Sequence, residues 1–280
     1  MKDYIKIGVE QGIISFDKEM SRITYTFQNK QRNYNNPEEK VQAETFLRLI
    51  IDYKYPENRI KQFVPVTMGS EVKEADIVVY EDDMCMSPHI LVECKRQEVS
   101  EAEYQQAIEQ AYSYAFALPC DIKYVWVTSG IKSDYFEVDK NQNSRNQLPD
   151  IPQFGVKNVA SYKYVYEAQY LPEEAGKQRF FDLSVIDQSE LTRRFKQAHE
   201  ALWAGGQLNP SEAFDELDKL IFCKIWDERK PRRMGEPYDF QIITVPKEVE
   251  KSETKRRLIE NDNLYKRVMA LYEEGRKKDK

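Results

Sequence analysis

The sequence lacks the residues and motifs on which several common chemistries depend. It has only two histidines, His89 and His199, far apart along its 280 residues. Catalysis by a histidine acid–base pair or by a His-ligated zinc ion is therefore poorly supplied. No GxSxG, Walker A or GxGxxG motif occurs, which removes the usual signatures of α/β hydrolases, P-loop enzymes and dinucleotide-binding enzymes.

Long apolar runs and closely spaced cysteines are also lacking. No run approaches the ~18 apolar residues of a membrane span, and residues 1–5 do not resemble a signal peptide. The four cysteines, Cys85, Cys94, Cys120 and Cys223, have no CxxC spacing. Free thiols in a reducing cytoplasm are the simplest interpretation, so we expect a cytoplasmic protein without a membrane partner.

The chain has no excess of positive charge. Its net charge is −6, which argues against a large surface for coating nucleic acid, because phosphate contacts need clustered Lys and Arg. The charge is uneven, however. Residues 191–280 hold 20 Lys and Arg against 17 Asp and Glu, a net charge of +3, which leaves −9 for residues 1–190.

Hydrophobic periodicity predicts a mixed α/β (α+β) fold with a central sheet flanked by helices and a C-terminal helical domain. We expect a division into domains 1–180 and 181–280, with residues 1–36 strand-rich and 139–158 loop-like. Ser100 and Glu103 form a capping-box pattern. The predicted strands are 13–16, 23–27, 60–67, 75–80, 89–95 and 122–128, and the predicted helices are 37–53, 100–118 (ended by Pro119), 191–203 (ended at Gly205-Gly206), 211–229 and 246–278.

Charged residues interrupt two apolar strands about twenty residues apart. Asp76 lies in the run 75–80, and Glu93 and Lys95 lie in the run 90–96. Strand side chains alternate, so Glu93 and Lys95 point the same way, and an adjacent hairpin strand would set Asp76 beside them. Two carboxylates and an amine at one end of a sheet predict a divalent-cation site with a water-orienting lysine. The alternative is surface decoration of a half-exposed sheet.

The order of these segments resembles the PD-(D/E)xK nuclease core. More specifically, it is similar to the N-terminal nuclease domain of type I restriction enzyme R subunits and related proteins. The resemblance covers about residues 37–132 and rests on 37–42, 75–80, 92–95, 110–115 and 127–130. It departs at Gln42, where the family often has arginine, and at Ala75, where proline is usual.

The resemblance implies roles for particular residues. Asp76, Glu93 and the backbone carbonyl of Cys94 would hold Mg²⁺, with Mn²⁺ able to substitute, and Lys95 would orient the attacking water. Gln110 and Tyr114, one helical turn apart, would position the substrate or the lysine; core packing is their alternative.

Support for the metal would come from the first helix. Glu39 or Glu38 would provide it, with Glu44 as an alternative one turn on. The simpler interpretation of Glu39 is an acidic residue in the first turn of a helix.

Residues 190–275 are similar to the helical segment that opens many N6-adenine DNA methylases. Any amphipathic bundle is the alternative, with His199 a packed residue. Asn209-Pro210-Ser211 lacks the second proline and the aromatic residue of an NPPY-type motif, and we expect Ser211 to cap the next helix. A basic cluster forms either a phosphate contact for DNA or a solvated turn: Arg229, Lys230, Arg232 and Arg233.

Together the resemblances imply a Mg²⁺-dependent DNA endonuclease domain of a restriction–modification system, of the type I-like restriction endodeoxyribonuclease class. Its expected partners are double-stranded DNA and methylase and specificity domains or subunits, within a larger polypeptide or as a self-standing subunit. Two alternatives remain open. One is a catalytically silent, nuclease-like module for DNA binding or assembly, and the other is a structural scaffold whose charges are solvated.

Overall fold

The computed structural model describes residues 2–118, 121–204 and 208–278. They form two compact units. The sheet unit comprises residues 2–159 and 175–178, and the helical unit comprises residues 160–174 and the described residues from 179 onward. The division into domains 1–180 and 181–280 stays a prediction.

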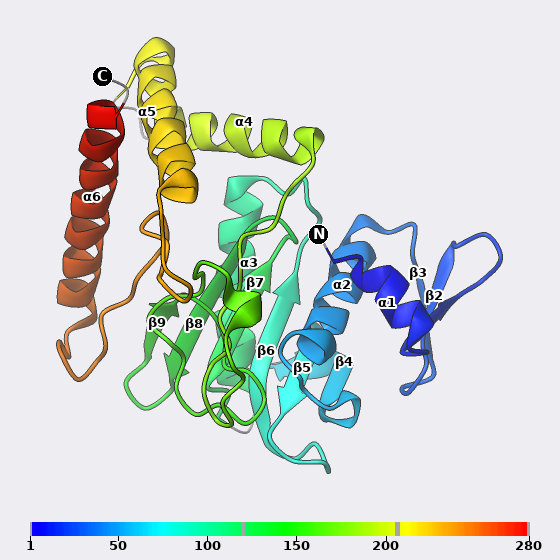
Figure 1. The fold of residues 1–280 in the computed structure, drawn as a ribbon. Helices are drawn as coiled ribbons and strands as arrows, with labels where there is room; N and C mark the ends of the chain where they lie inside the picture. The colour runs from blue at the N-terminus through cyan, green and yellow to red at the C-terminus, as the bar shows by residue number, and fades with distance from the viewer. Residues whose placement is uncertain (1, 119–120, 205–207, 279–280) are drawn as a thin grey trace. The chain divides into compact units, whose positions relative to one another are not determined.

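A six-stranded mixed sheet forms the centre of the sheet unit. Its strands lie in sequence order, and β6 (Pro88–Cys94) and β7 (Tyr124–Thr128) are parallel while all other neighbours are antiparallel. Helices α2 (Pro37–Ile51) and α3 (Glu101–Ala117) cover its two faces (Figure 1). The predicted α+β architecture is confirmed. The strands are β4 (Ile60–Met68), β5 (Glu71–Tyr80), β6 (Pro88–Cys94), β7 (Tyr124–Thr128), β8 (Ser133–Asp139) and β9 (Ser144–Leu148).

Both flanking helices begin where the sequence predicts, and each has a capping side chain at its N-terminus. The Asn36 side chain accepts a hydrogen bond from the backbone N–H of Glu38, and Pro37 opens α2. Ser100 and Glu103 form the predicted capping box at the start of α3. Pro119, expected to end that helix, lies outside the described residues.

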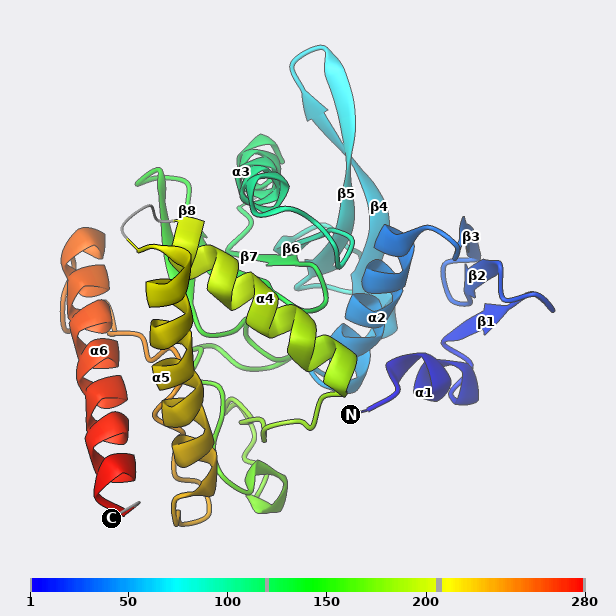
Figure 2. The same ribbon diagram turned by 90° about the horizontal axis from the view of Figure 1, so that it is seen from above.

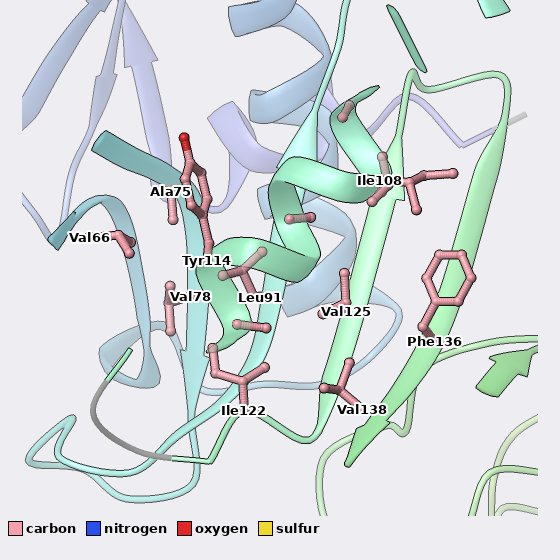
Figure 3. Close-up of a cluster of buried hydrophobic side chains, with 14 of the residues drawn as sticks. Val66, Ala75, Val78, Leu91, Ile108, Tyr114, Ile122, Val125, Phe136 and Val138 are labelled. Carbon is pink, nitrogen blue, oxygen red and sulfur yellow. The ribbon is translucent and has the colours of Figure 1, made fainter. Parts of the chain in front are cut away.

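The apolar core beneath α3 holds this helix on the sheet (Figure 3). Val78, Leu91 and Val125 are fully buried in it, and the Tyr104 hydroxyl donates to the carbonyl of Val127 at 2.9 Å. Tyr114 closes the end of the cluster beside Ala75, with its hydroxyl pointing away from Ile122. The same helix therefore reaches from the apolar core to the neighbourhood of Asp76.

Strand β5 separates from β6 near the middle of β5. The last β5–β6 pair is Ile77 with Val92, whereas β5 remains paired with β4 as far as Glu71 and Met68. The far half of the β4–β5 hairpin therefore projects from the sheet (Figure 2). Asp76 is the first residue after the separation.

The N-terminal region contains a small second sheet. Strands β1 (Ile14–Phe16), β2 (Arg22–Tyr25) and β3 (Lys30–Asn33) form an antiparallel sheet in that order. The strands predicted near 13–16 and 23–27 are confirmed, whereas β3 was not predicted. Helix α1 (Tyr4–Glu10) was not predicted either, and it packs on α2 so closely that a Cβ at Gly8 would lie 2.5 Å from Leu47.

The loop expected over residues 139–158 is wrong in its first part. Strand β9 pairs with β8 through the turn that follows Asp139. The Asp139 carboxylate accepts from the backbone N–H groups of Asn141 and Gln142, and Asn143 has a φ of 47°. Asparagine and aspartate support such turns, but the strand residues themselves are polar, so the hairpin has little hydrophobic signal.

The helical unit contains α4 (Gln188–Ala204), α5 (Pro210–Arg229) and α6 (Glu253–Lys278). Asn209, not the expected Ser211, caps α5, because its side chain accepts from the N–H groups of Ser211 and Glu212. Helix α6 begins seven residues later than predicted, and Gly205-Gly206 lies outside the described residues. A short 3₁₀ turn occurs at Ala168–Tyr170 in this unit, and another occurs at Glu57–Arg59 in the sheet unit.

Two further expectations concern membranes and thiols. In the part of the chain that the structure describes, every helix is too short or too polar to cross a membrane. Cys85, Cys94 and Cys223 are free thiols, as predicted. Cys120 lies outside the described residues.

A buried ion pair between Asp227 and Arg232 stabilises the loop that follows α5. Asp227 is 0% exposed and Arg232 is 1% exposed at the side chain, and the guanidinium of Arg232 donates to the Asp227 carboxylate. The same carboxylate accepts from the N–H groups of Asp239 and Phe240 at 3.1 and 2.9 Å. The pair therefore ties residues 232–240 to the last turns of α5.

Asp227→Ala is expected to destabilise the protein by roughly 3–5 kcal/mol, because it removes the buried carboxylate and leaves the buried guanidinium with the partly exposed carboxylate of Asp239, 3.3 Å away. Chemical denaturation followed by circular dichroism measures the change. The control Glu216→Ala removes an exposed pair with Lys219 and should cost about 1 kcal/mol or less. Equal effects of the two substitutions would contradict this account.

Candidate active site

Asp76 is held where β5 leaves β6. Its Oδ2 accepts a hydrogen bond from the backbone N–H of Cys94 at 2.6 Å. Continuing the register from Ile77–Val92 sets Asp76 opposite Glu93. The carboxylate thus satisfies a β6 N–H group that β5 no longer reaches, and this fixes Asp76 beside Glu93.

Glu93 is a buried carboxylate with one oxygen unsatisfied. The residue is 2% exposed, and its Oε1 accepts from the Lys95 amine at 2.9 Å. Its Oε2 has no hydrogen-bond partner among the described residues. A buried carboxylate oxygen without a partner is costly, so this atom is free to bind a cation or a donor from outside the chain.

The two carboxyl groups raise the electrostatic energy of the site. Burial, and then the charge of Glu93, raises the pKa of Asp76 well above its usual value, against the opposing effects of the Cys94 N–H and Lys95. Burial also raises the pKa of Glu93, although Lys95 opposes it. Burial alone would lower the pKa of Lys95, but Glu93 and then Asp76 outweigh it and the net shift is upward. Lys95 therefore stays protonated beside two carboxyl groups.

In α2, Glu38 rather than Glu39 is the carboxylate that interacts with this site. The charge of Glu38 acts on Asp76, Glu93 and Lys95. The structure does not join Glu39 to them, because its carboxylate accepts from the Tyr25 hydroxyl at 2.5 Å.

The alternative Glu44 also acts elsewhere. Its charge is felt by Tyr4 and Tyr34. Of the three acidic residues considered in this helix, Glu38 is thus the one whose charge acts on the pair, and its support of a metal stays a prediction.

Helix α3 contributes the predicted Gln110 and Tyr114. The Gln110 amide donates to the Tyr114 hydroxyl at 2.7 Å. Tyr114 is 3% exposed and packs in the core, and burial followed by the charge of Glu93 raises its pKa. The ring of Tyr114 therefore packs in the core, while its hydroxyl interacts electrostatically with the Glu93 carboxylate.

A buried amide pair beside Asp76 was missed by sequence reasoning. Gln42 Nε2 donates to Gln62 Oε1 at 3.0 Å and to the backbone carbonyl of Asp76 at 3.1 Å. Both glutamines are under 5% exposed. The signal was present at Gln42, a polar residue on the apolar face of α2 one turn after Glu38. Gln42 therefore holds the Asp76 backbone, whereas the Cys94 N–H holds the Asp76 carboxylate.

The donor set suits one kind of metal ion. Among the described residues, no group of three or more His, Cys, Asp and Glu side chains is arranged to hold a metal. Asp76 and Glu93 offer two carboxylates, one with an unpaired oxygen. Mg²⁺ commonly binds through one or two carboxylates and keeps several waters, so the site fits Mg²⁺ better than a fully protein-ligated ion.

The predicted basic cluster lies in the other unit and is only partly available. The expectation that Arg232 contacts DNA needs correction, because its guanidinium is buried against Asp227. Lys230 pairs with Asp239. Arg229 and Arg233 are exposed, and their contact with DNA stays a prediction.

Residues 37–152 match the family described as type I restriction enzyme R protein N terminus. Asp76, Glu93, Lys95, Gln110 and Tyr114 all lie inside this match, which supports the restriction-subunit part of the resemblance. The match ends before residue 190, so the methylase-like segment stays a prediction.

Similarity to solved structures and to curated proteins is limited. A solved fragment of an HsdR subunit of a type I restriction enzyme from Vibrio vulnificus is 22% identical, with a TM-score of 0.30. That similarity covers 40% of this chain and 23% of the other. No curated protein matches the chain.

The raised pKa of Asp76 predicts that ionisation of this carboxyl group lowers the free energy of unfolding, so that the effect depends on pH. A raised folded-state pKa stabilises the fold below the unfolded value, about 3.9, and this contribution is lost as the pH rises through the folded value. In EDTA, Asp76→Asn should therefore be more stable than the wild type at pH 8 and lose that advantage near pH 4. Urea denaturation at both pH values measures the difference. An advantage that does not change with pH would contradict the electrostatic cause, and Asp121→Asn, at an 81% exposed side chain, is the control.

Proposed function

We propose that the sheet unit is a Mg²⁺-dependent DNA endonuclease domain of a type I-like restriction enzyme. The observation that supports this most directly is the meeting of Asp76, Glu93 and Lys95 where β5 separates from β6. The match of residues 37–152 to the R-protein N terminus supports the restriction–modification context. The reaction is hydrolysis of a phosphodiester bond by water.

Asp76 and Glu93 would hold the metal, with the Cys94 carbonyl as a third protein ligand. When bound, Mg²⁺ supplies polarisation of the scissile phosphate and a lowered pKa of a coordinated water. The chain contributes preorganisation: the Cys94 N–H fixes one carboxylate, and Lys95 fixes the other. Metal binding would relieve the repulsion between the two carboxyl groups.

Lys95 is the positive side chain at the site. Since its neighbours keep it protonated, its amine can donate hydrogen bonds both to Glu93 and to a water or phosphate oxygen. A fixed donor aimed at an oxygen that gains negative charge lowers the barrier to attack on phosphorus. Gln110 and Tyr114 provide a second set of donors, which would hold the substrate or the lysine in place.

The wider assignment follows from the family context. Double-stranded DNA is the proposed substrate, and methylase and specificity domains or subunits of the same system are the proposed partners. The alternative, a nuclease-like module that binds DNA without cutting it, would retain the fold and lose the role of Lys95.

Lys95→Ala is expected to reduce Mg²⁺- or Mn²⁺-dependent nicking of supercoiled plasmid by at least about 10²-fold, because the fixed donor is lost. The assay uses the protein assembled with its methylase and specificity partners. Lys123→Ala, at the other end of β7 from Thr128, is the matched control and should cleave normally.

Unchanged cleavage by Lys95→Ala would refute the catalytic role. DNA binding without any cleavage by the assembled wild type would favour the silent module. Circular dichroism of both variants shows whether the fold is retained.

A further inference from the structure

Two basic side chains lie over one aromatic ring at the edge of the sheet unit, and a third interacts with one of them from β4. The Arg32 guanidinium carbon lies 3.6 Å from the centre of the Phe63 ring, and the Lys30 amine lies 5.4 Å from it. Lys61, two residues before Phe63 on β4, interacts electrostatically with Lys30. Because two of these cations stack on the same ring, they are held in fixed positions.

The cluster has little negative charge of its own. Among the described residues, Glu74 is the one carboxylate within ion-pair distance of any of the three cations, 4.0 Å from Arg32. Burial first, and then Arg32 and Lys61, lowers the pKa of Lys30, while Glu74 opposes this. In a chain of net charge −6, adjacent cations without matching carboxylates favour an anion from outside.

The cluster lies next to the candidate active site. Phe63 falls opposite Asp76, between the β4–β5 pairs Gln62–Ile77 and Val64–Ala75. Phe63 has a φ of 56°, a left-handed conformation that costs roughly 1–3 kcal/mol and is concentrated at functional sites. The irregularity in β4 thus coincides with the residue where β5 leaves β6.

The small N-terminal sheet connects the cations to the start of α2. Lys30 is the cross-strand partner of the buried Tyr25, and Tyr25 donates to Glu39 in the first turn of α2. The next residue back, Glu38, acts on Asp76 and Glu93. The basic cluster and the carboxylate pair therefore flank the same helix start.

The chemistry of the cluster fits a phosphate backbone. A guanidinium stacked by its face on an aromatic ring keeps its N–H edge for two hydrogen bonds to phosphate oxygens. The three cations come from two strands in two sheets, so they present separate charges to a repeating anion. Phosphate contacts of this kind position nucleic acid without reading its sequence.

We propose that Lys30, Arg32 and Lys61 form a DNA-backbone contact surface that holds duplex DNA beside Asp76 and Glu93. This inference rests on the proposed function for its choice of DNA as the anion. It places the main basic contact of the sheet unit in the small N-terminal sheet and β4.

The test measures binding of the full chain to a fluorescent duplex in EDTA, by anisotropy over a series of salt concentrations. Lys61→Gln and Arg32→Gln should each weaken binding and reduce the slope of log K against log salt by about 0.9, the effect of one lost phosphate contact. Arg32→Lys should retain most of the slope. Lys123→Gln removes the same charge just before β7, three strands away from β4, and should bind as the wild type does.

Unchanged affinity and slope in the Lys61 and Arg32 variants would overturn the proposal, as would a wild type that does not bind the duplex. Lys30 and Arg32 would then serve to protect the edge strand β3 from pairing with another chain. Because the assay contains no divalent metal, its result is independent of cleavage. If Lys95→Ala loses cleavage and the Lys61 variant binds DNA as the wild type does, the nuclease is supported and this surface is excluded. If Lys95→Ala cleaves normally and the Lys61 variant binds more weakly, the nuclease alone is excluded.

Discussion

The separation of β5 from β6 at Asp76 is the constraint on which the site depends. One strand bends away while the other continues, which leaves the N–H of Cys94 without a backbone partner on β5. The Asp76 carboxylate takes that hydrogen bond at 2.6 Å, and the Gln42 amide holds the Asp76 carbonyl at 3.1 Å. The Asp76 carboxylate is thereby fixed opposite Glu93, at the point where the β5–β6 ladder ends. In a continuous ladder, a backbone carbonyl of β5 would have taken the hydrogen bond from the Cys94 N–H.

This arrangement stores electrostatic energy in the fold. Burial raises the pKa of both carboxyl groups, the charge of Glu93 raises that of Asp76 further, and Lys95 compensates only part of this. A structural ion pair would have satisfied both oxygens of Glu93, whereas Oε2 has no partner in the part of the chain that the structure describes. Such an imbalance is typical of a site that is completed by a ligand. Stability and function therefore place opposite demands on the same two side chains.

Much of the central architecture was readable from the sequence, because buried strands and capped helices carry strong local signals. Charge inside an apolar strand correctly pointed to Asp76 and Glu93 as neighbours. What could not be read depended on long-range packing. Strands β3 and β9 are polar and exist through their pairing, and the choice of Glu38 over Glu39 depended on which side chain Tyr25 binds. The burial of Arg232 likewise required knowledge of the loop that returns to Asp227.

The central claim is that Asp76 and Glu93 hold one divalent cation between them. Crystals soaked in Mn²⁺ and measured at the manganese absorption edge test it most directly. The account predicts an anomalous peak in contact with carboxylate oxygens of both residues, and its disappearance in crystals of Glu93→Gln. The absence of a peak there in wild-type crystals, or a peak that touches neither carboxylate, would contradict the account.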